Sequence, residues 1–314
     1  MTVEEQSFGP VRFLPGENGG RYPFCHSLYV EGAGVLIDPA SSRERLIRLR
    51  AEEGVKMVWL SHWHEDHFMH LDLFDDLPLW VSPGDAPPLA DLQILLDWYG
   101  FDAEERQFWE PLLREQFHFR PRIPARRLLG GETLRLGNVS VEVIATPGHT
   151  PGHLAFFFRD HGVLFSGDYD LTRFGPWYGD LFSDIDATRA SIALLQKIGA
   201  QIVLTGHETG VFEQPPAELW RLYGAVIAER EKRLLDLLET PRTLKEIVEA
   251  CIIYKRPREP KAFFAFGERA LMKKHLEHLI RRDIVILEDE RYRQNEVKLS
   301  APREGIPDTE DSGL

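Results

Sequence analysis

Six side chains that can bind metal ions crowd into the ten-residue stretch SHWHEDHFMH, residues 61–70. It follows the apolar run VKMVWL (55–60), which is typical of a buried strand. In an extended segment residues i and i+2 point the same way, so the imidazoles of His62 and His64 can reach one ion. Asp66 and His67 are adjacent. If the chain turns into a helix there, their side chains point to a second position beside the first ion. Imidazole nitrogens and a carboxylate are natural ligands of zinc and similar first-row metals. The spacing therefore predicts a metal site.

Three later places in the chain put a ligand-type residue just past the end of an expected strand. The strand 139–145 leads into TPGHTPGH, the strand 163–166 into Gly-Asp, and the strand 201–205 into Gly-His. In α/β folds sites collect at strand ends, and a preceding glycine lets the backbone approach an ion closely. We therefore expect His149, Asp168 and His207 to join the site. His70 and His153 are interpreted as packing or supporting residues, with a role in the site as the alternative.

These residues, taken in order, resemble the signature of the metallo-β-lactamase superfamily: His62-x-His64-x-Asp66-His67, then His149, Asp168 and His207. The resemblance covers the first two thirds of the chain. It implies an α/β fold, a four-layer αβ/βα sandwich with two sheets face to face and helices outside. It also implies the ligand sets. The first metal would be held by His62, His64 and His149, the second by Asp66, His67 and His207, and Asp168 would bridge the two.

Two divalent metal ions close together can bridge a water molecule, lower its pKa toward neutrality and polarise a substrate carbonyl or phosphoryl oxygen. The predicted function is therefore metal-dependent hydrolysis by a metal-bridged hydroxide, with Asp66 as the catalytic residue that orients the nucleophile or takes its proton. Zinc is the expected metal, with iron and manganese as alternatives. A small (thio)ester or lactone is the expected substrate. The motif is closer to glyoxalase II, the lactonases and the nucleases of the metallo-β-lactamase fold than to the secreted β-lactamases.

Two segments are predicted to border the substrate. Residues 86–119 form a helical insert rich in aromatic side chains, which would lie over the metals as a lid. Its aromatic side chains would form an apolar pocket or pack the lid onto the domain, and both interpretations stay open. The loop DYDLTRFGPWY, residues 168–178, begins at the expected bridging aspartate. Because the loop starts there, Tyr169, Arg173 and Tyr178 are candidates for substrate binding. The alternative for Arg173 is a surface salt bridge.

The chain has 314 residues, a hydrophobic share of 43% and a formal net charge of −13. This charge disfavours a sequence-independent grip on nucleic acid, although a local basic patch is compatible with it. Its two cysteines cannot form a disulfide framework, and the N-terminus lacks the basic start and apolar core of a signal peptide. Without an apolar run of membrane-spanning length, we expect a cytoplasmic protein with no membrane partner. A homodimer is left open.

The pattern of elements divides the chain. Residues 1–227 alternate expected strands and helices, with helices over 43–53 and 186–198. Residues 228–300 read as helix, helix and hairpin after a long helix over 216–239, which is the order of a winged-helix domain. The third helix of this pattern is expected over 268–282, and 301–314 as a mobile tail.

The C-terminal pattern is similar to the winged-helix extension of the lactamase-like endoribonuclease subgroup. Basic clusters lie at KRPREPK (255–261) and at Lys273, Lys274, Arg281 and Arg282. Cleavage of single-stranded RNA is therefore the alternative function. A mononuclear-iron oxygenase on the same fold and a metal-sensing DNA-binding regulator remain as two further classes.

Overall fold

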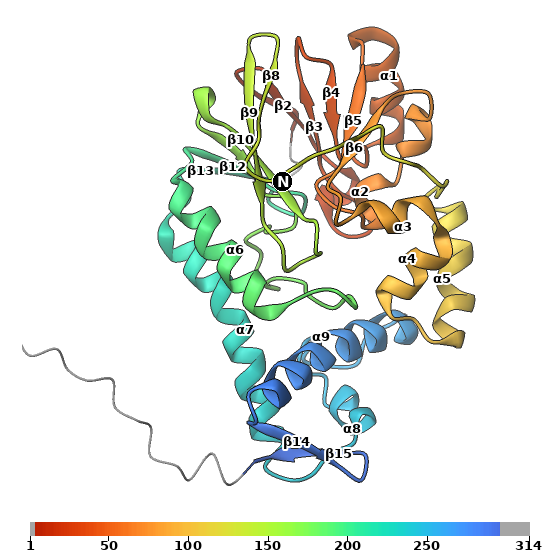
Figure 1. Cartoon of the computed structure of the whole chain (residues 1–314), viewed down its shortest axis with the longest axis vertical. Coiled ribbons are helices and arrows are strands. Elements are labelled where there is room, and N and C mark those ends of the chain that lie inside the picture. Colours follow the sequence, from red (N-terminus) through yellow and green to blue (C-terminus); the bar gives the residue numbers. More distant parts are fainter. Residues whose placement is uncertain (1–3, 296–314) are drawn as a thin grey trace, which may run out of the picture.

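Two mixed sheets form the centre of the protein, whose computed structural model describes residues 4–295 (Figure 1). In the first sheet the strands follow chain order, antiparallel from β1 to β4 and parallel from β4 to β7. The second has the order β13-β12-β11-β10-β9-β8, with β11 and β12 parallel. The first sheet contains β1 (Gln6–Phe8), β2 (Val11–Leu14), β3 (Ser27–Val30), β4 (Val35–Ile37), β5 (Met57–Trp59), β6 (Leu79–Val81) and β7 (Arg126–Arg127). The second contains β8 (Thr133–Leu136), β9 (Val139–Ala145), β10 (Leu154–Phe158), β11 (Val163–Phe165), β12 (Ile202–Leu204) and β13 (Val211–Glu213).

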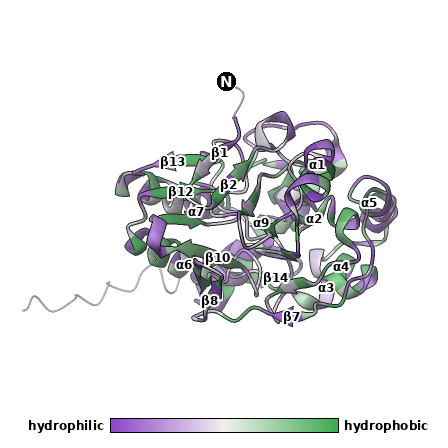
Figure 2. Cartoon of the chain, turned by 90° about the horizontal axis from the view of Figure 1, so that it is seen from above, coloured by the Kyte–Doolittle hydropathy of each residue, from purple (hydrophilic) through white to green (hydrophobic). Residues whose placement is uncertain are grey.

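The alternation of side chains along the strands produces the layers. In β10, Phe156 packs between the sheets against Trp59, with ring centroids 5.4 Å apart, while Phe157 faces the outer helices. Helix α1 (Arg43–Glu53) covers the outer face of the first sheet, and α6 (Ile185–Ile198) and α7 (Ala217–Leu237) cover that of the second. In Figure 2 the second sheet is largely hydrophobic in colour and α5 largely hydrophilic. The α/β sandwich expected from the sequence is confirmed.

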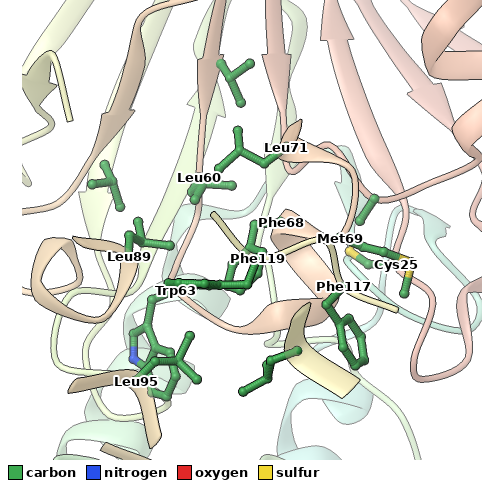
Figure 3. Close-up of a cluster of buried hydrophobic side chains, with 14 of the residues drawn as sticks. Cys25, Leu60, Trp63, Phe68, Met69, Leu71, Leu89, Leu95, Phe117 and Phe119 are labelled. Atoms are coloured by element: carbon green, nitrogen blue, oxygen red, sulfur yellow. The ribbon is translucent and has the colours of Figure 1, made fainter. Parts of the chain in front are cut away.

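Three helices occupy the insert expected over 86–119: α3 (Ala86–Ala90), α4 (Leu92–Tyr99) and α5 (Ala103–Glu115). Asp102 begins α5 with a capping box, in which its carboxylate accepts from the N–H of Glu105. Pro111 lies inside α5 and neither breaks nor starts it. Figure 3 shows the core shared by this insert and the metal-ligand stretch, with Trp63 beside Leu95 and Phe68 beside Phe119. Short helical turns lie at α2 (Glu65–Phe68), Glu17–Gly20, Leu71–Phe74 and Arg159–His161.

The C-terminal segment follows the expected order of helices and hairpin. It contains α8 (Leu244–Glu249), α9 (Lys261–Arg281), β14 (Val285–Glu288) and β15 (Arg291–Gln294). Helix α9 begins at Lys261 rather than at residue 268, and it runs from the side of α4 and α5 toward α7 across the open end of the sandwich (Figure 1). There Phe266 packs on Phe101, with ring centroids 4.8 Å apart, and Arg269 pairs with Glu105. The first turns of α9 are therefore part of the wall around the sandwich opening.

Helix α7 continues without a break through residue 227, where the sequence suggests a domain boundary. The division of the chain into domains stays a prediction. The expected tail, 301–314, lies outside the described residues. Among the helices of residues 4–295, none is long and apolar enough to cross a membrane.

Candidate metal centre

The ends of four strands place the predicted ligands at one edge of the sandwich. His62 and His64 follow β5, and His149 follows β9. Asp168 follows β11 and His207 follows β12, and these two strands are parallel. Because β9, β11 and β12 run in one direction, their carboxyl ends present these side chains together, opposite the carboxyl ends of the parallel strands β4 and β5.

A first cluster joins three histidines and one aspartate. His62 Nε2 lies 3.0 Å from His64 Nδ1 and 3.1 Å from His149 Nε2. His149 Nε2 and His64 Nδ1 are 2.9 Å apart. Asp168 Oδ2 lies 3.4 Å from His149 Nε2, and the four residues form one group of potential metal ligands.

A second cluster lies on the other side of Asp168. His67 Nε2 is 3.3 Å from His207 Nε2 and 2.7 Å from Asp168 Oδ1. Asp66 Oδ2 is 3.3 Å from His207 Nε2. The two oxygens of Asp168 thus face different clusters, which is the arrangement of a bridging carboxylate. Cys25 Sγ is 3.4 Å from His67 Nδ1, and Cys25 forms a group of potential metal ligands with His67 and His207.

Two carboxylates that the sequence does not single out fix the orientation of ring nitrogens. Asp180 Oδ2 lies 2.7 Å from His64 Nε2, and Asp38 Oδ2 lies 2.9 Å from His67 Nδ1. An ionised carboxylate only accepts hydrogen bonds, so each of these outer nitrogens carries the proton and donates it. Such partners set the tautomer of a metal-binding histidine and hold its ring in place.

Backbone carbonyls do the same for two further histidines. His149 Nδ1 donates to the carbonyl of Trp177 at 3.0 Å, and His207 Nδ1 donates to that of Gly20 at 2.8 Å. A carbonyl oxygen has no proton to give, so these nitrogens are also protonated. Their Nε2 atoms are left with a free lone pair.

The outer ring nitrogen of His62 also donates a hydrogen bond, in this case to the hydroxyl of Ser61. The Ser61 hydroxyl donates to Asp38 Oδ2 at 2.7 Å, so its oxygen accepts from His62 Nδ1 at 2.9 Å. In their neutral form, all five histidines therefore carry the proton on the outer nitrogen and turn an unprotonated nitrogen inward. Bare nitrogens that face one another at 2.9–3.3 Å repel unless a cation lies among them. The donor set fits two metal ions.

The buried surroundings shift the acidity of these groups. Burial and the neighbouring His67 lower the pKa of His62 well below its ordinary value. Burial also opposes protonation of His64, but the Asp180 carboxylate outweighs it and raises the pKa to about 9. Burial would raise the pKa of Asp168, but His67 and His207 hold it well below its usual range. The central carboxylate is therefore ionised.

Glycine is required beside the second cluster. A Cβ at Gly206 would lie 2.9 Å from His67 Cε1 and 3.0 Å from Asp168 Oδ1. This confirms the close backbone approach expected from the Gly-His pair, because a side chain there would displace the ligands.

The two clusters open into a cavity of about 350 Å³. His64, Asp66, His149, Asp168 and His207 lie on its floor. Aromatic side chains from the N-terminal loop, the insert, the loop after β11 and the C-terminal segment form its walls. They are Tyr22, Tyr99, Phe101, Trp109, Phe174, Trp177, Tyr254, Phe263, Phe264 and Phe266. The sequence predicts the aromatic lid but misses Tyr254 and the contribution of α9.

The loop after β11 is placed differently from the sequence expectation. Tyr169 and Tyr178 are fully buried and do not line the cavity. Tyr169 donates to the carbonyl of Pro147 at 3.1 Å, and the Tyr178 hydroxyl lies 2.9 Å from His275 Nε2. Both tyrosines therefore anchor the loop. The third candidate, Arg173, is exposed to solvent and does not line the cavity.

The two histidines left open by the sequence lie outside the ligand clusters. His153 Nε2 accepts from the N–H of Asp168 at 3.2 Å, so it supports the central carboxylate through the backbone. His70 lies on the far side of α2 near His118, with ring centroids 5.7 Å apart, and does not line the cavity.

Comparison with known families agrees with this geometry. Residues 20–207 match the family described as the metallo-beta-lactamase superfamily. The chain belongs to this superfamily. The matched range contains both clusters and the whole insert, so the superfamily resemblance expected from the sequence is confirmed.

Within the superfamily, one of two similar curated relatives is named as a hydrolase and the other as a thioesterase. A hydroxyacylglutathione hydrolase of Acidiphilium cryptum is 29% identical over 181 residues, which is 56% of this chain and 60% of the relative. An acyl-coenzyme A thioesterase of Gallus gallus is 26% identical over 184 residues, 57% of this chain and 62% of the relative. The chain thus spans about 60% of the length of each of these relatives.

A solved structure extends the likeness beyond the family match. A metallo-beta-lactamase family protein of Thermus thermophilus has a TM-score of 0.70 at 25% identity. The superposition covers 91% of this chain and 99% of the Thermus chain. The C-terminal helices and hairpin are therefore largely part of the shared fold.

Proposed function

We propose that the protein is a two-metal hydrolase of acyl thioesters or esters whose acyl part is apolar. One observation carries the proposal: the two ligand clusters form the polar floor of a cavity with aromatic walls. Such a cavity suits a ligand that buries an apolar group and presents one polar bond to the floor.

The ligand sets implied by the sequence are retained as part of this proposal. His62, His64 and His149 hold the first metal, Asp66, His67 and His207 hold the second, and Asp168 bridges them. When bound, two divalent ions lower the pKa of a water molecule toward neutrality and polarise the carbonyl of the substrate. Zinc is the proposed metal, with iron and manganese as alternatives.

Asp66 is the proposed catalytic residue. It lines the cavity, and its Oδ2 atom lies 3.3 Å from His207 Nε2, beside the second cluster. From this position its carboxylate can orient the attacking water and accept a proton from it. The neighbouring Glu65 is held in place by the hydroxyls of Tyr22, at 2.7 Å, and Tyr99. These two bonds tie the metal-ligand stretch to the N-terminal loop and to the insert.

The walls of the cavity position the acyl part and keep water away from it. Trp109 of α5 packs against Phe263 of α9, with ring centroids 5.8 Å apart, so the insert and the C-terminal segment close on each other. Trp177 adds a third side and donates from Nε1 to Asp180 Oδ1 at 3.2 Å. Exclusion of water strengthens electrostatic interactions at the floor.

Two alternatives to thioester hydrolysis are lactone hydrolysis and RNA cleavage, and the burial of α9 bears on the second. A lactone fits the same cavity and remains within the ester class. The winged-helix interpretation and RNA cleavage remain predictions. The burial of half of α9 supports a structural role for it, since residues such as Phe266, Leu271 and His275 are not free to face a nucleic acid.

A substrate panel tests the proposal. Protein of measured metal content would receive a benzoyl thioester of N-acetylcysteamine, a decanoic lactone, a chromogenic cephalosporin and a labelled single-stranded RNA. We expect thiol release from the thioester, reduced at least about 100-fold in Asp66→Ala. RNA cleavage that is lost in Asp66→Ala, without turnover of the thioester or the lactone, would replace the proposal with the endoribonuclease alternative.

A further inference from the structure

The loop that joins Tyr254 to Phe263 carries an unusual concentration of positive charge. All residues from 255 to 262 are exposed, and Glu259 is the acidic residue among them. The carboxylate of Glu259 accepts from the backbone N–H of Lys261 at 2.9 Å. Within residues 4–295 no carboxylate pairs with the four cations of this loop. They are Lys255, Arg256, Arg258 and Lys261.

Several other surface arginines do have carboxylate partners. Arg43 pairs with Asp72 at 2.7 Å and Arg50 with Asp76 at 2.7 Å. In a chain with a net charge of −13, carboxylates are plentiful, so four neighbouring cations without one are available to bind an external anion.

The loop lies at the rim of the aromatic cavity. Arg258 Cζ is 5.9 Å from the ring centroid of Tyr254 and 5.6 Å from that of Phe264, and both rings line the cavity. Phe174, 5.8 Å from Tyr254, lines it too, and the adjacent Arg173 is exposed without an ion pair in the described part of the chain. Cations from two loops thus flank one edge of the opening.

We propose that this basic rim, formed by residues 255–261 and Arg173, binds the phosphate groups of a phosphorylated thiol carrier whose acyl group enters the aromatic cavity. The inference rests on the proposed thioester hydrolysis. Arginine forms paired hydrogen bonds with phosphate, and several cations match a carrier with more than one negative charge. Each level of the cavity then matches one part of the substrate. The metal ligands on the floor face the reacting carbonyl, the aromatic walls hold the apolar acyl chain, and the cations at the rim bind the charged carrier.

The same order distinguishes this ligand from RNA. In RNA cleavage the reacting group is itself a phosphodiester and must reach the floor, where Glu65, Asp66, Asp170 and Glu208 also line the cavity. In a thioester the reacting carbon is uncharged, and the phosphates stay at the rim. During hydrolysis the oxygen of water bonds to the acyl carbon and the C–S bond breaks. Its electron pair leaves with the sulfur, which takes up a proton, so the carrier departs as a free thiol.

Two thioesters with the same benzoyl group test the proposal. One carries coenzyme A, which has phosphates, and the other N-acetylcysteamine, which is uncharged. We expect kcat/KM to be higher for the coenzyme A thioester, and the ratio of the two values to fall roughly tenfold in the double variant R256E/R258E. The double variant K197E/K273E changes the net charge equally at exposed positions that do not line the cavity, and should keep the wild-type ratio.

The outcomes separate this inference from the proposed function. Equal kcat/KM values for both thioesters in the wild type would overturn the proposed phosphate binding at the basic rim. They would leave the proposed thioester hydrolysis in place. A ratio that falls equally in both double variants would also overturn it, since the effect would come from overall charge. No turnover of either thioester would overturn both. Cleavage of single-stranded RNA that is lost in R256E/R258E would assign the rim to RNA phosphates instead.

Discussion

Asparagine in place of Asp168 is expected to lower kcat/KM at least about a thousandfold and to release metal from both clusters. Asp168 is the residue whose two oxygens face different clusters, at 2.7 Å from His67 Nε2 and 3.4 Å from His149 Nε2. An amide keeps the size of the side chain but removes the negative charge, and its NH₂ group turns a donor toward one cluster. The metal content, measured by elemental analysis of the purified variant, should fall together with activity.

Asp170→Asn is the matched control. Asp170 lies two residues further along the same loop and lines the same cavity, but it belongs to neither ligand cluster. Its carboxylate accepts from the N–H of Thr172 at 3.1 Å. This variant should keep its full metal content. Retention of two metals per chain by Asp168→Asn, or an equal loss of metal from both variants, would contradict the bridging role of Asp168.

Removal of the metals is expected to lower the melting temperature by at least about 10 °C. At a concentration about 1,000 times its Kd, each ion stabilises the fold by about 4 kcal/mol, and each kcal/mol shifts Tm by about 2–4 °C in a protein of this size class. The structural reason lies in the inward nitrogens, because His62 Nε2, His64 Nδ1 and His149 Nε2 face one another within 3.1 Å. Thermal unfolding of the metal-loaded protein, with and without a chelator, measures the shift.

The control for this shift is the Asp168→Asn variant, which should show a much smaller response to the chelator. Re-addition of the metal to the stripped wild-type protein should restore its Tm. An unchanged Tm after the metal has been removed would show that the clusters pack stably without ions and would contradict the metal-centre interpretation.

The sequence predicts the residues of the clusters well because each follows a strand that hydrophobic periodicity identifies. His149, Asp168 and His207 all lie just after such strands, and parallel strands bring their carboxyl ends to one edge. The same signal was available for Asp38, which follows β4 directly, but an Asp-Pro pair is also a common strand terminator. The sequence gives no comparable indication for Asp180, because an irregular loop rather than the end of a strand places it beside His64.

The walls of the cavity could not be predicted in the same way. The first turns of α9 follow a stretch with prolines and basic residues, and such a composition indicates a loop. Their aromatic side chains meet α4 and α5, which precede them by roughly 150 residues in the chain, as in the contact of Phe266 with Phe101. Contacts over such separations leave no local pattern. The same applies to Tyr169 and Tyr178, whose position beside Asp168 does not reveal that both point into the core.

The most direct measurement of the central claim is turnover of the benzoyl N-acetylcysteamine thioester as metal is added stepwise to the stripped protein. The two clusters on either side of Asp168 predict that thiol release rises until two equivalents per chain are bound and then stays constant. Full activity at one equivalent would show that a single cluster suffices. Activity without any dependence on metal would contradict the two-metal hydrolase altogether.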